Sequence, residues 1–411
     1  MQKSLTSFPK EKIKILLLEG IHPSSLKLFH DNGFDNVESL THSLPEDKLI
    51  EKTKDVHLLG IRSKTQLTEK VLTNAHKLLA AGCFCIGTNQ VDLNTATEHG
   101  IAVFNSPFSN TRSVAELVIG NSIMLLRRVF EKNEAAHRGG WLKDSADCYE
   151  VRGKTLGIIG YGHIGSQVSV LAEAMGMKVL FYDVMPKLSL GNAQAARSLD
   201  ELLKSSDVVS LHVPGTSETK ELINETQLKK MKRGAILINL SRGDVMNTEA
   251  VKDALQKRQL GGLAVDVFPS EPKSNKDKFE SALQNLPNVI LTPHIGGSTV
   301  EAQEAIGLDV AEKLICFTDT GSSAGSLTVP DMSLPVLHNA HRILHIHHNV
   351  PGVLSQINSM LSAMKVNIVG QYLKTNDKIG YAVLDIDKKS SPEVMIELKA
   401  VKETIRTRNL Y

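Results

Sequence analysis

The sequence has few cysteines, few aromatic residues and no excess of either charge. Four cysteines in a chain of 411 residues are too few for a disulfide framework. Lys and Arg total 47 and Asp and Glu total 45, so the net charge is only +2. This balance excludes a general electrostatic attraction to nucleic acids or anionic membranes. We therefore expect small-molecule partners that bind in pockets.

Long apolar runs are also missing. No run approaches the roughly 20 residues that a membrane span requires, and the most apolar helix candidate, 114–129, contains Glu116, Asn121 and Arg127. The polar N-terminus has no signal-peptide core, so a cytoplasmic location is expected. The only tryptophan, Trp141, falls in a polar stretch, where an oligomer contact and local packing are both open.

A glycine-rich turn between a strand and a helix is the strongest pattern in the chain. Residues 156–159 are apolar, as in a buried parallel strand, and Gly160, Gly162 and Gly165 follow them. In a dinucleotide-binding turn the first glycine permits the tight bend, the second admits a pyrophosphate, and the third lets helix and strand pack closely. The phosphates would lie at the N-terminus of the helix.

An acid at the end of the next strand indicates which dinucleotide is bound. The strand predicted at 178–182 ends at Asp183, at the distance from the glycines that the motif requires. A carboxylate there can accept hydrogen bonds from both ribose hydroxyls and repels a 2′-phosphate. The sequence therefore predicts NAD rather than NADP.

Strands alternating with helices predict an α/β fold with two doubly wound parallel sheets. Because an apolar strand pattern recurs before and after the crossing at 105–116, we expect a flavodoxin-like substrate domain (1–108 and 297–336) and a Rossmann NAD domain (109–296). The Rossmann strands are predicted at 156–160, 178–182, 207–211, 235–240, 261–266 and 288–292. One helix is expected from about 111 to 138 and another over 299–315.

The C-terminal part differs in pattern. Residues 317–337 are rich in Gly, Ser, Thr and Pro and predict a linker. Beyond it, residues 337–411 have the order strand, helix, strand, strand, helix, strand, which predicts a small ferredoxin-like domain.

Three polar residues follow predicted strands of the Rossmann domain: Arg242, Glu271 and His294. Strand ends of one parallel sheet meet at one edge, so the three are expected to converge. Their types fit hydride transfer at a hydroxy acid. His294 would remove the hydroxyl proton, Glu271 would fix its tautomer and stabilise the imidazolium, and Arg242 would bind the carboxylate. Each alone could equally be an ordinary loop residue. In the first domain, Arg62 could hold a substrate anion.

At these residues the sequence resembles the D-isomer-specific 2-hydroxyacid dehydrogenases, and within them those with a C-terminal ACT domain. The matching segments cover nearly the whole chain: 109–116, 156–165, 239–243, 266–272 and 292–298. The resemblance implies oxidation of 3-phosphoglycerate to 3-phosphohydroxypyruvate with NAD, the first step of serine biosynthesis. It also implies a homo-oligomer, with a tetramer expected, and no metal.

The resemblance extends the expected site. It implies substrate contacts at Arg62, Ser63 and Asn110. It implies cofactor contacts at Gly160, Gly162, His163, Ile164, Gly165, Asp183, Leu240, Ser241, Asp266, Gly296 and Gly297.

In the ACT domain the resemblance implies that serine, an allosteric feedback inhibitor, binds through His347, Asn349 and Asn367. The five histidines between 338 and 348 also raise the alternative of a metal site, which we regard as the weaker interpretation. His348 departs from the acid that similar chains tend to carry, which puts strong serine inhibition in doubt. Two other functions stay open: reduction of another 2-oxo acid (2-oxoglutarate, hydroxypyruvate or glyoxylate) and a non-catalytic NAD-sensing role.

Overall fold

The computed structural model describes residues 9–272, 276–335, 341–387 and 391–410. The chain divides into two compact units. One unit combines Met1–Ser109 with Gln303–Tyr411, and the other is Asn110–Ala302. The predicted boundaries at 108/109, 296/297 and 336/337 stay predictions, and residues 336 and 337 lie outside the described part of the chain.

The first unit begins with a five-stranded parallel sheet of order β2-β1-β3-β4-β5. Alternate residues of these strands enter two different cores: one face packs against α1 and α11, the other against α2, α3 and α4. This order confirms the flavodoxin-like prediction. The elements are β1 (Ile15–Leu17), α1 (Pro23–Asp31), β2 (Val37–Ser39), α2 (Glu46–Thr53), β3 (Leu58–Ile61), α3 (Glu69–Asn74), β4 (Ala80–Cys83), α4 (Leu93–Glu98) and β5 (Ala102–Asn105).

Strand β2 was not predicted because its three residues are polar or only half-buried at best. It pairs with β1 at the edge of the sheet, where one side of a strand faces solvent. An edge strand needs no apolar run, so hydrophobic periodicity gives no signal for it.

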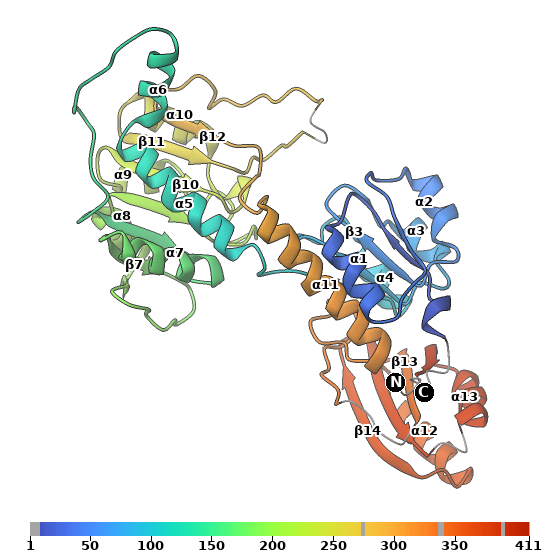
Figure 1. Ribbon diagram of the computed structural model, residues 1–411. Coiled ribbons are helices and arrows are strands. Elements are labelled where there is room, and N and C mark those ends of the chain that lie inside the picture. The colour runs from blue at the N-terminus through green and yellow to red at the C-terminus, as the bar shows by residue number, and fades with distance from the viewer. Residues whose placement is uncertain (1–8, 273–275, 336–340, 388–390, 411) are drawn as a thin grey trace. The chain divides into compact units, whose positions relative to one another are not determined.

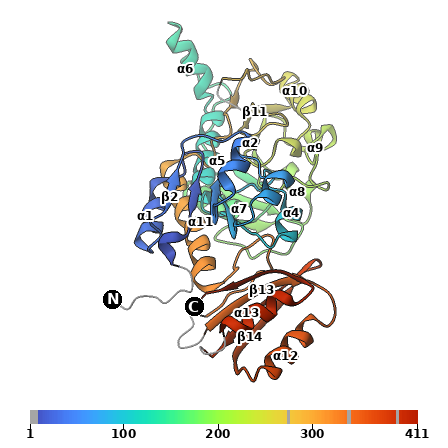
Figure 2. The ribbon, with the colours of Figure 1, turned by 90° about the vertical axis from the view of Figure 1, so that its right-hand side faces the viewer.

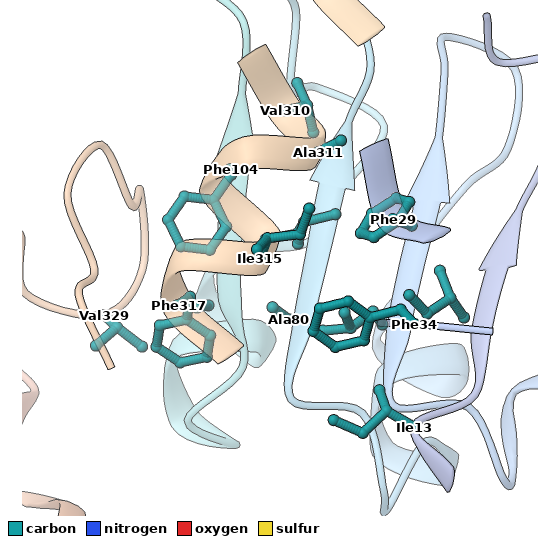
Figure 3. Packing of buried hydrophobic residues seen from close by; sticks show 14 of the residues in the cluster. Ile13, Phe29, Phe34, Ala80, Phe104, Val310, Ala311, Ile315, Phe317 and Val329 are labelled. Carbon is teal, nitrogen blue, oxygen red and sulfur yellow. The ribbon is translucent and has the colours of Figure 1, made fainter. Parts of the chain in front are cut away.

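Helix α11 (Val300–Thr320) closes one face of the first sheet and is longer than predicted. Figure 3 shows Ile315 and Phe317 of α11 lying beside Phe104 and Ala80 of the sheet. The linker predicted over 317–337 begins later than expected, because residues 317–320 continue the helix. Residues 321–335 form no helix or strand, but hydrogen bonds hold them against the first sheet. Thr328 Oγ1 donates to Ile101 O at 2.7 Å and accepts from Val103 N at 3.0 Å, and Val329 is buried.

The C-terminal region forms an antiparallel sheet of order β14-β15-β13-β16. Its element order is the predicted one, and α12 and α13 cover one face (Figure 2). The other face shares a core with the first sheet through Leu344, Ile346 and Tyr381. The elements are β13 (His341–His348), α12 (Val353–Ala363), β14 (Ile368–Thr375), β15 (Ile379–Ile386), α13 (Ser391–Ala400) and β16 (Thr404–Asn409).

The second unit is a seven-stranded parallel sheet of order β12-β11-β10-β9-β6-β7-β8 (Figure 1). Helices α5 and α7 pack on one face and α8, α9 and α10 on the other. This is a Rossmann arrangement, as predicted, with one more strand than expected. The strands are β6 (Thr155–Ile159), β7 (Lys178–Tyr182), β8 (Gln194–Ala195), β9 (Val208–Leu211), β10 (Ala235–Asn239), β11 (Leu260–Val265) and β12 (Val289–Leu291).

The helices of this unit correct one prediction. The single helix expected to about residue 138 is two helices, α5 (Thr111–Leu126) and α6 (Val129–His137), separated at Arg128, whose φ of 53° is left-handed. A non-glycine residue in that region ends a helix. The others are α7 (His163–Ala174), α8 (Leu199–Ser205), α9 (Glu225–Lys230) and α10 (Thr248–Gln256). Among the described residues, no helix is long and apolar enough to cross a membrane.

Candidate active site

The glycine turn after β6 has the geometry that a dinucleotide needs. Gly160 has φ of 92°, and a Cβ there would collide with His212 O. A Cβ on Gly165 would overlap Gly160 O, so the helix can approach the strand only with glycine. At Gly162 a Cβ would meet no atom within 4 Å, and the first turn of α7 has no side-chain cap. Uncapped N–H groups beside an open position fit a pyrophosphate. His163 and Ile164 begin this turn.

Asp183 is held at the end of β7 by the chain itself. Its Oδ2 accepts from Tyr161 N at 2.8 Å and its Oδ1 from Met185 N at 2.9 Å. These bonds fix the carboxylate next to the glycine turn and leave each oxygen with a further lone pair. The arrangement therefore fits the adenosine ribose of NAD.

The register of three neighbouring strands brings the predicted catalytic residues to one edge. Asn239 of β10 lies opposite Val265 of β11, and Val265 lies opposite Leu291 of β12. Arg242, Glu271 and His294 each follow one of these strand ends by a few residues. The edge is the carboxyl end of the sheet, where ligands of such folds bind.

Glu271 and His294 are in direct contact. His294 Nδ1 lies 2.9 Å from Glu271 Oε2 and 3.1 Å from Oε1. An ionised carboxylate only accepts, so Nδ1 carries the proton and the lone pair of the neutral ring is on Nε2. The His294 side chain is 54% exposed, so Nε2 can reach a substrate. The pair has the form of a general base held by an orienting acid.

The backbone of His294 is strained and is held by Asp266. His294 has φ of 55°, a conformation that a non-glycine residue adopts only when its surroundings impose it. The buried Asp266 carboxylate accepts from Thr292 Oγ1 at 2.5 Å and from Ile295 N and Gly296 N at 2.8 Å each. These bonds fix the turn that carries His294, and the cofactor contact expected of Asp266 stays a prediction. Thr292 begins the matching segment 292–298 but was not predicted as a site residue.

Arg242 lies in a loop that the side chain of Asn239 holds by hydrogen bonds. The Asn239 amide donates to Arg242 O at 2.9 Å and accepts from Ser241 N at 3.1 Å and Ser241 Oγ at 2.9 Å. Leu240 and Ser241 are buried. The Arg242 side chain is exposed and its Nη1 donates to Ser241 O at 2.7 Å. Most donors of its guanidinium therefore remain available for a carboxylate.

The predicted substrate residues occur in both units. Arg62 and Ser63 directly follow β3 in the first unit, with Arg62 half-buried and Ser63 exposed. Asn110 precedes α5 in the second unit. Its side chain makes no cap bond to that helix. Instead its amide lies against Gly297, where a Cβ would collide with it, and its buried Oδ1 has no partner among the described residues.

The predicted effector residues are near the end of β13 and the start of β14. His347 is buried, and its Nδ1 lies 2.8 Å from His348 O. Asn349 is exposed and donates to Asn376 O at 2.7 Å, and Asn367 is exposed. The described part of the chain has no group of three or more potential metal ligands. His338, part of the histidine-rich stretch, lies outside the described residues.

Comparisons with known proteins extend over most of the chain. The NAD-binding domain of D-isomer-specific 2-hydroxyacid dehydrogenases matches residues 119–296. A D-3-phosphoglycerate dehydrogenase of Dictyostelium discoideum is 54% identical over 99% of both chains. The chain belongs to the D-isomer-specific 2-hydroxyacid dehydrogenase family. A D-3-phosphoglycerate dehydrogenase of Escherichia coli K12 is 52% identical over 98% of this chain and 99% of its own.

The solved structures agree with this family. A D-lactate dehydrogenase from Aquifex aeolicus, in complex with NAD and lactic acid, matches with a TM-score of 0.66 and 31% identity over 77% of this chain and 100% of its own. The AHAS small subunit-like ACT domain matches residues 343–406. Like other D-isomer-specific 2-hydroxyacid dehydrogenases, the chain therefore has an NAD-binding domain, which confirms the predicted cofactor, and it also has an ACT domain.

Proposed function

We propose that this enzyme oxidises D-3-phosphoglycerate to 3-phosphohydroxypyruvate with NAD, the first step of serine biosynthesis. One observation carries the chemical part of the proposal: the Glu271–His294 pair, at 2.9 Å, stands at the carboxyl edge of the NAD-binding sheet. The substrate assignment is supported by relatives that are named D-3-phosphoglycerate dehydrogenases and match the chain over almost its full length.

The chain's own residues can carry the proton and orient the acid. NAD supplies the acceptor for the hydride that leaves C2 of the substrate. His294 Nε2 takes the C2 hydroxyl proton, and the imidazolium that forms is stabilised by the Glu271 carboxylate on Nδ1. Arg242 binds the substrate carboxylate through its remaining guanidinium donors. In the reverse direction the same imidazolium returns the proton to the carbonyl oxygen.

The three substrate residues would distinguish this acid from smaller ones. Arg62 offers a planar set of donors suited to a phosphate, and Ser63 adds an exposed hydroxyl next to it. Asn110 has a buried side chain and an Oδ1 with no described partner, so it can bond a polar group of the substrate.

The decisive experiment measures NADH formation from 3-phosphoglycerate at alkaline pH by purified protein. The same preparation is tested in reverse, with NADH, on 3-phosphohydroxypyruvate, hydroxypyruvate, glyoxylate and 2-oxoglutarate. We expect the highest kcat/KM with the phosphorylated acid. A higher kcat/KM for an unphosphorylated acid would replace the proposed substrate. NAD binding without turnover of any acid would favour the non-catalytic role.

Serine feedback, a tetrameric assembly and a cytoplasmic location stay predictions. The serine prediction is supported by the ACT match and by His347, whose Nδ1 must donate to the His348 carbonyl. Its Nε2 is then an acceptor, buried and without a described partner, which suits an amino-acid ammonium group. Titrating serine into the NADH assay, for the wild type and for His347→Ala, tests this directly. Analytical ultracentrifugation measures the assembly.

A further inference from the structure

The loop that carries Arg62 is hydrogen-bonded to the carboxylate of Glu19, which follows the neighbouring strand β1. Glu19 Oε1 accepts from Arg62 N at 3.1 Å and from Thr65 N at 2.8 Å, and Glu19 Oε2 accepts from Lys64 N at 2.9 Å. Three backbone N–H groups of one four-residue loop thus converge on a single side chain. Converging N–H groups of this kind form a site for an anion, and here the anion belongs to the chain.

Glu19 adopts an unfavourable backbone conformation in this position. It follows β1, which lies beside β3 in the sheet, and its φ is 65°. Residues other than glycine rarely have a positive φ, and where they do, the surrounding contacts impose this conformation. The same turn directs Glu19 O toward the Arg62 guanidinium, with Nη1 at 3.5 Å. Glu19 therefore contacts both the backbone and the side chain of Arg62.

The opposite side of the Arg62 peptide is held by a second residue. Gln90, which is buried, donates from Nε2 to Arg62 O at 2.9 Å. Arg62 is thus fixed at its N–H by Glu19 and at its carbonyl by Gln90. This leaves the side chain of Arg62 as the part that can move to a ligand.

We propose that Glu19 is a positioning residue that sets Arg62 for the phosphate of the substrate; this inference rests on the proposed function. Because the Glu19 carboxylate already takes the N–H groups of the loop, the substrate phosphate is bound by side chains, those of Arg62 and Ser63. Glu19 itself does not touch the substrate. The recognition of phosphate then depends on an acid that no motif of the family match includes.

A purely structural anchor would give different kinetics. Loss of such an anchor lowers stability and affects every substrate alike. Loss of a positioning residue raises KM for the phosphorylated acid and leaves an unphosphorylated acid nearly unchanged, because only the former needs Arg62 in place. The comparison between 3-phosphohydroxypyruvate and hydroxypyruvate therefore separates the two roles.

The test uses Glu19→Gln and Glu19→Ala in the full-length enzyme, with NADH and each of these two acids. Gln keeps one oxygen, which can still accept from Arg62 N and Thr65 N, but it loses the acceptor for Lys64 N. We expect KM for 3-phosphohydroxypyruvate to rise about tenfold in Glu19→Gln, the loss of about one charge-assisted hydrogen bond. We expect a larger rise in Glu19→Ala, with kcat and the KM for hydroxypyruvate within about twofold of wild type.

The matched control is Glu38→Gln, which removes an acid of the same unit that pairs with Lys52 at 2.6 Å. It should leave both KM values unchanged. Hydrogen exchange of the 62–65 amides provides a readout that needs no turnover, and these amides should exchange faster in Glu19→Gln than in Glu38→Gln.

The outcomes are distinct. Equal rises in KM for both acids, or no change in either, would overturn the positioning role while wild-type activity upholds the proposed function. If the wild type fails to use 3-phosphohydroxypyruvate at all, the proposed function falls, and the role of Glu19 toward phosphate falls with it. If Glu19→Ala does not fold, Glu19→Gln still decides between the roles.

Discussion

Removing one partner of the buried Arg342–Asp385 ion pair should destabilise the first unit strongly. Both side chains are essentially inaccessible, at 0% and 3% exposure. Arg342 Nε donates to Asp385 Oδ1 at 2.7 Å and Nη2 to Oδ2 at 2.8 Å. Its Nη1 donates to Thr320 O at 3.0 Å and Pro335 O at 2.9 Å. The pair therefore joins the ACT sheet to the end of α11.

The size of the effect follows from burial. Asp385→Asn leaves the guanidinium without its countercharge, and breaking a buried pair in this way costs about 3 to 5 kcal/mol. Replacing both residues, as in Arg342→Met with Asp385→Leu, removes both charges and should recover part of that loss. Recovery should be incomplete, because the carbonyls of Thr320 and Pro335 lose their donor, at about 1 to 3 kcal/mol for each buried group.

Urea unfolding followed by far-UV circular dichroism measures these differences. Fluorescence of Trp141 would be the wrong probe, since that residue belongs to the other unit. Glu201→Gln, which breaks an exposed pair with Arg197, is the control and should have no measurable effect. If Asp385→Asn costs no more than this control, or if the double variant is less stable than Asp385→Asn, the reasoning from burial is wrong.

Three further predictions concern the site and the ACT domain. Glu271→Gln keeps an acceptor for His294 Nδ1 but loses the charge, so kcat should fall about 100-fold with little change in NAD affinity; an unchanged kcat would remove Glu271 from the mechanism. Asp183→Asn should raise KM for NAD about tenfold and reduce the preference over NADP, and unchanged kinetics with both cofactors would contradict the ribose assignment. Burial and the neighbouring His347 lower the pKa of His345 to about 4. The unfolded chain protonates the His345 ring more readily than the folded chain does. The free energy of unfolding therefore has its full value above pH 6.5 and decreases as the pH falls toward 4, with a loss of about 2 kcal/mol at pH 5. Between pH 8 and pH 5 the melting temperature of His345→Gln should therefore fall less than that of the wild type. An identical fall would refute the lowered pKa of His345.

The NAD-binding half of the site was predictable because its signals are local. Gly160 and Gly165 are needed where the backbone leaves no room for a Cβ, and Asp183 follows a strand. Both features can be read from the order of the residues. The contact between Glu271 and His294 required one further step, namely that parallel strands end at one edge. That step holds for any sheet of this class, so residues 23 positions apart could be brought together before the structure was known.

The predictions of one long helix and of a linker starting at residue 317 failed for a different reason. The break between α5 and α6 depends on a left-handed Arg128, which no propensity scale would place there. Residues 321–335 have the composition of a linker, yet Ser323 Oγ donates to Pro330 O at 2.6 Å and is itself buried. Small polar residues can fill a core when they satisfy the backbone of their own segment. Composition cannot distinguish that use from a solvated connection.

Two carboxylates that accept backbone N–H groups share a task that sequence patterns do not reveal. Asp266 takes the amides of Ile295 and Gly296 and so fixes the strained His294, and Glu19 takes three amides of the loop that carries Arg62. In both cases the acid comes from the end of a strand that lies beside the one leading into the loop. In both loops, the acid at the end of one strand thus holds the segment that follows the neighbouring strand. The acids to test by mutation in such enzymes therefore include those whose oxygens face backbone amides, which a search for residues facing the ligand would pass over.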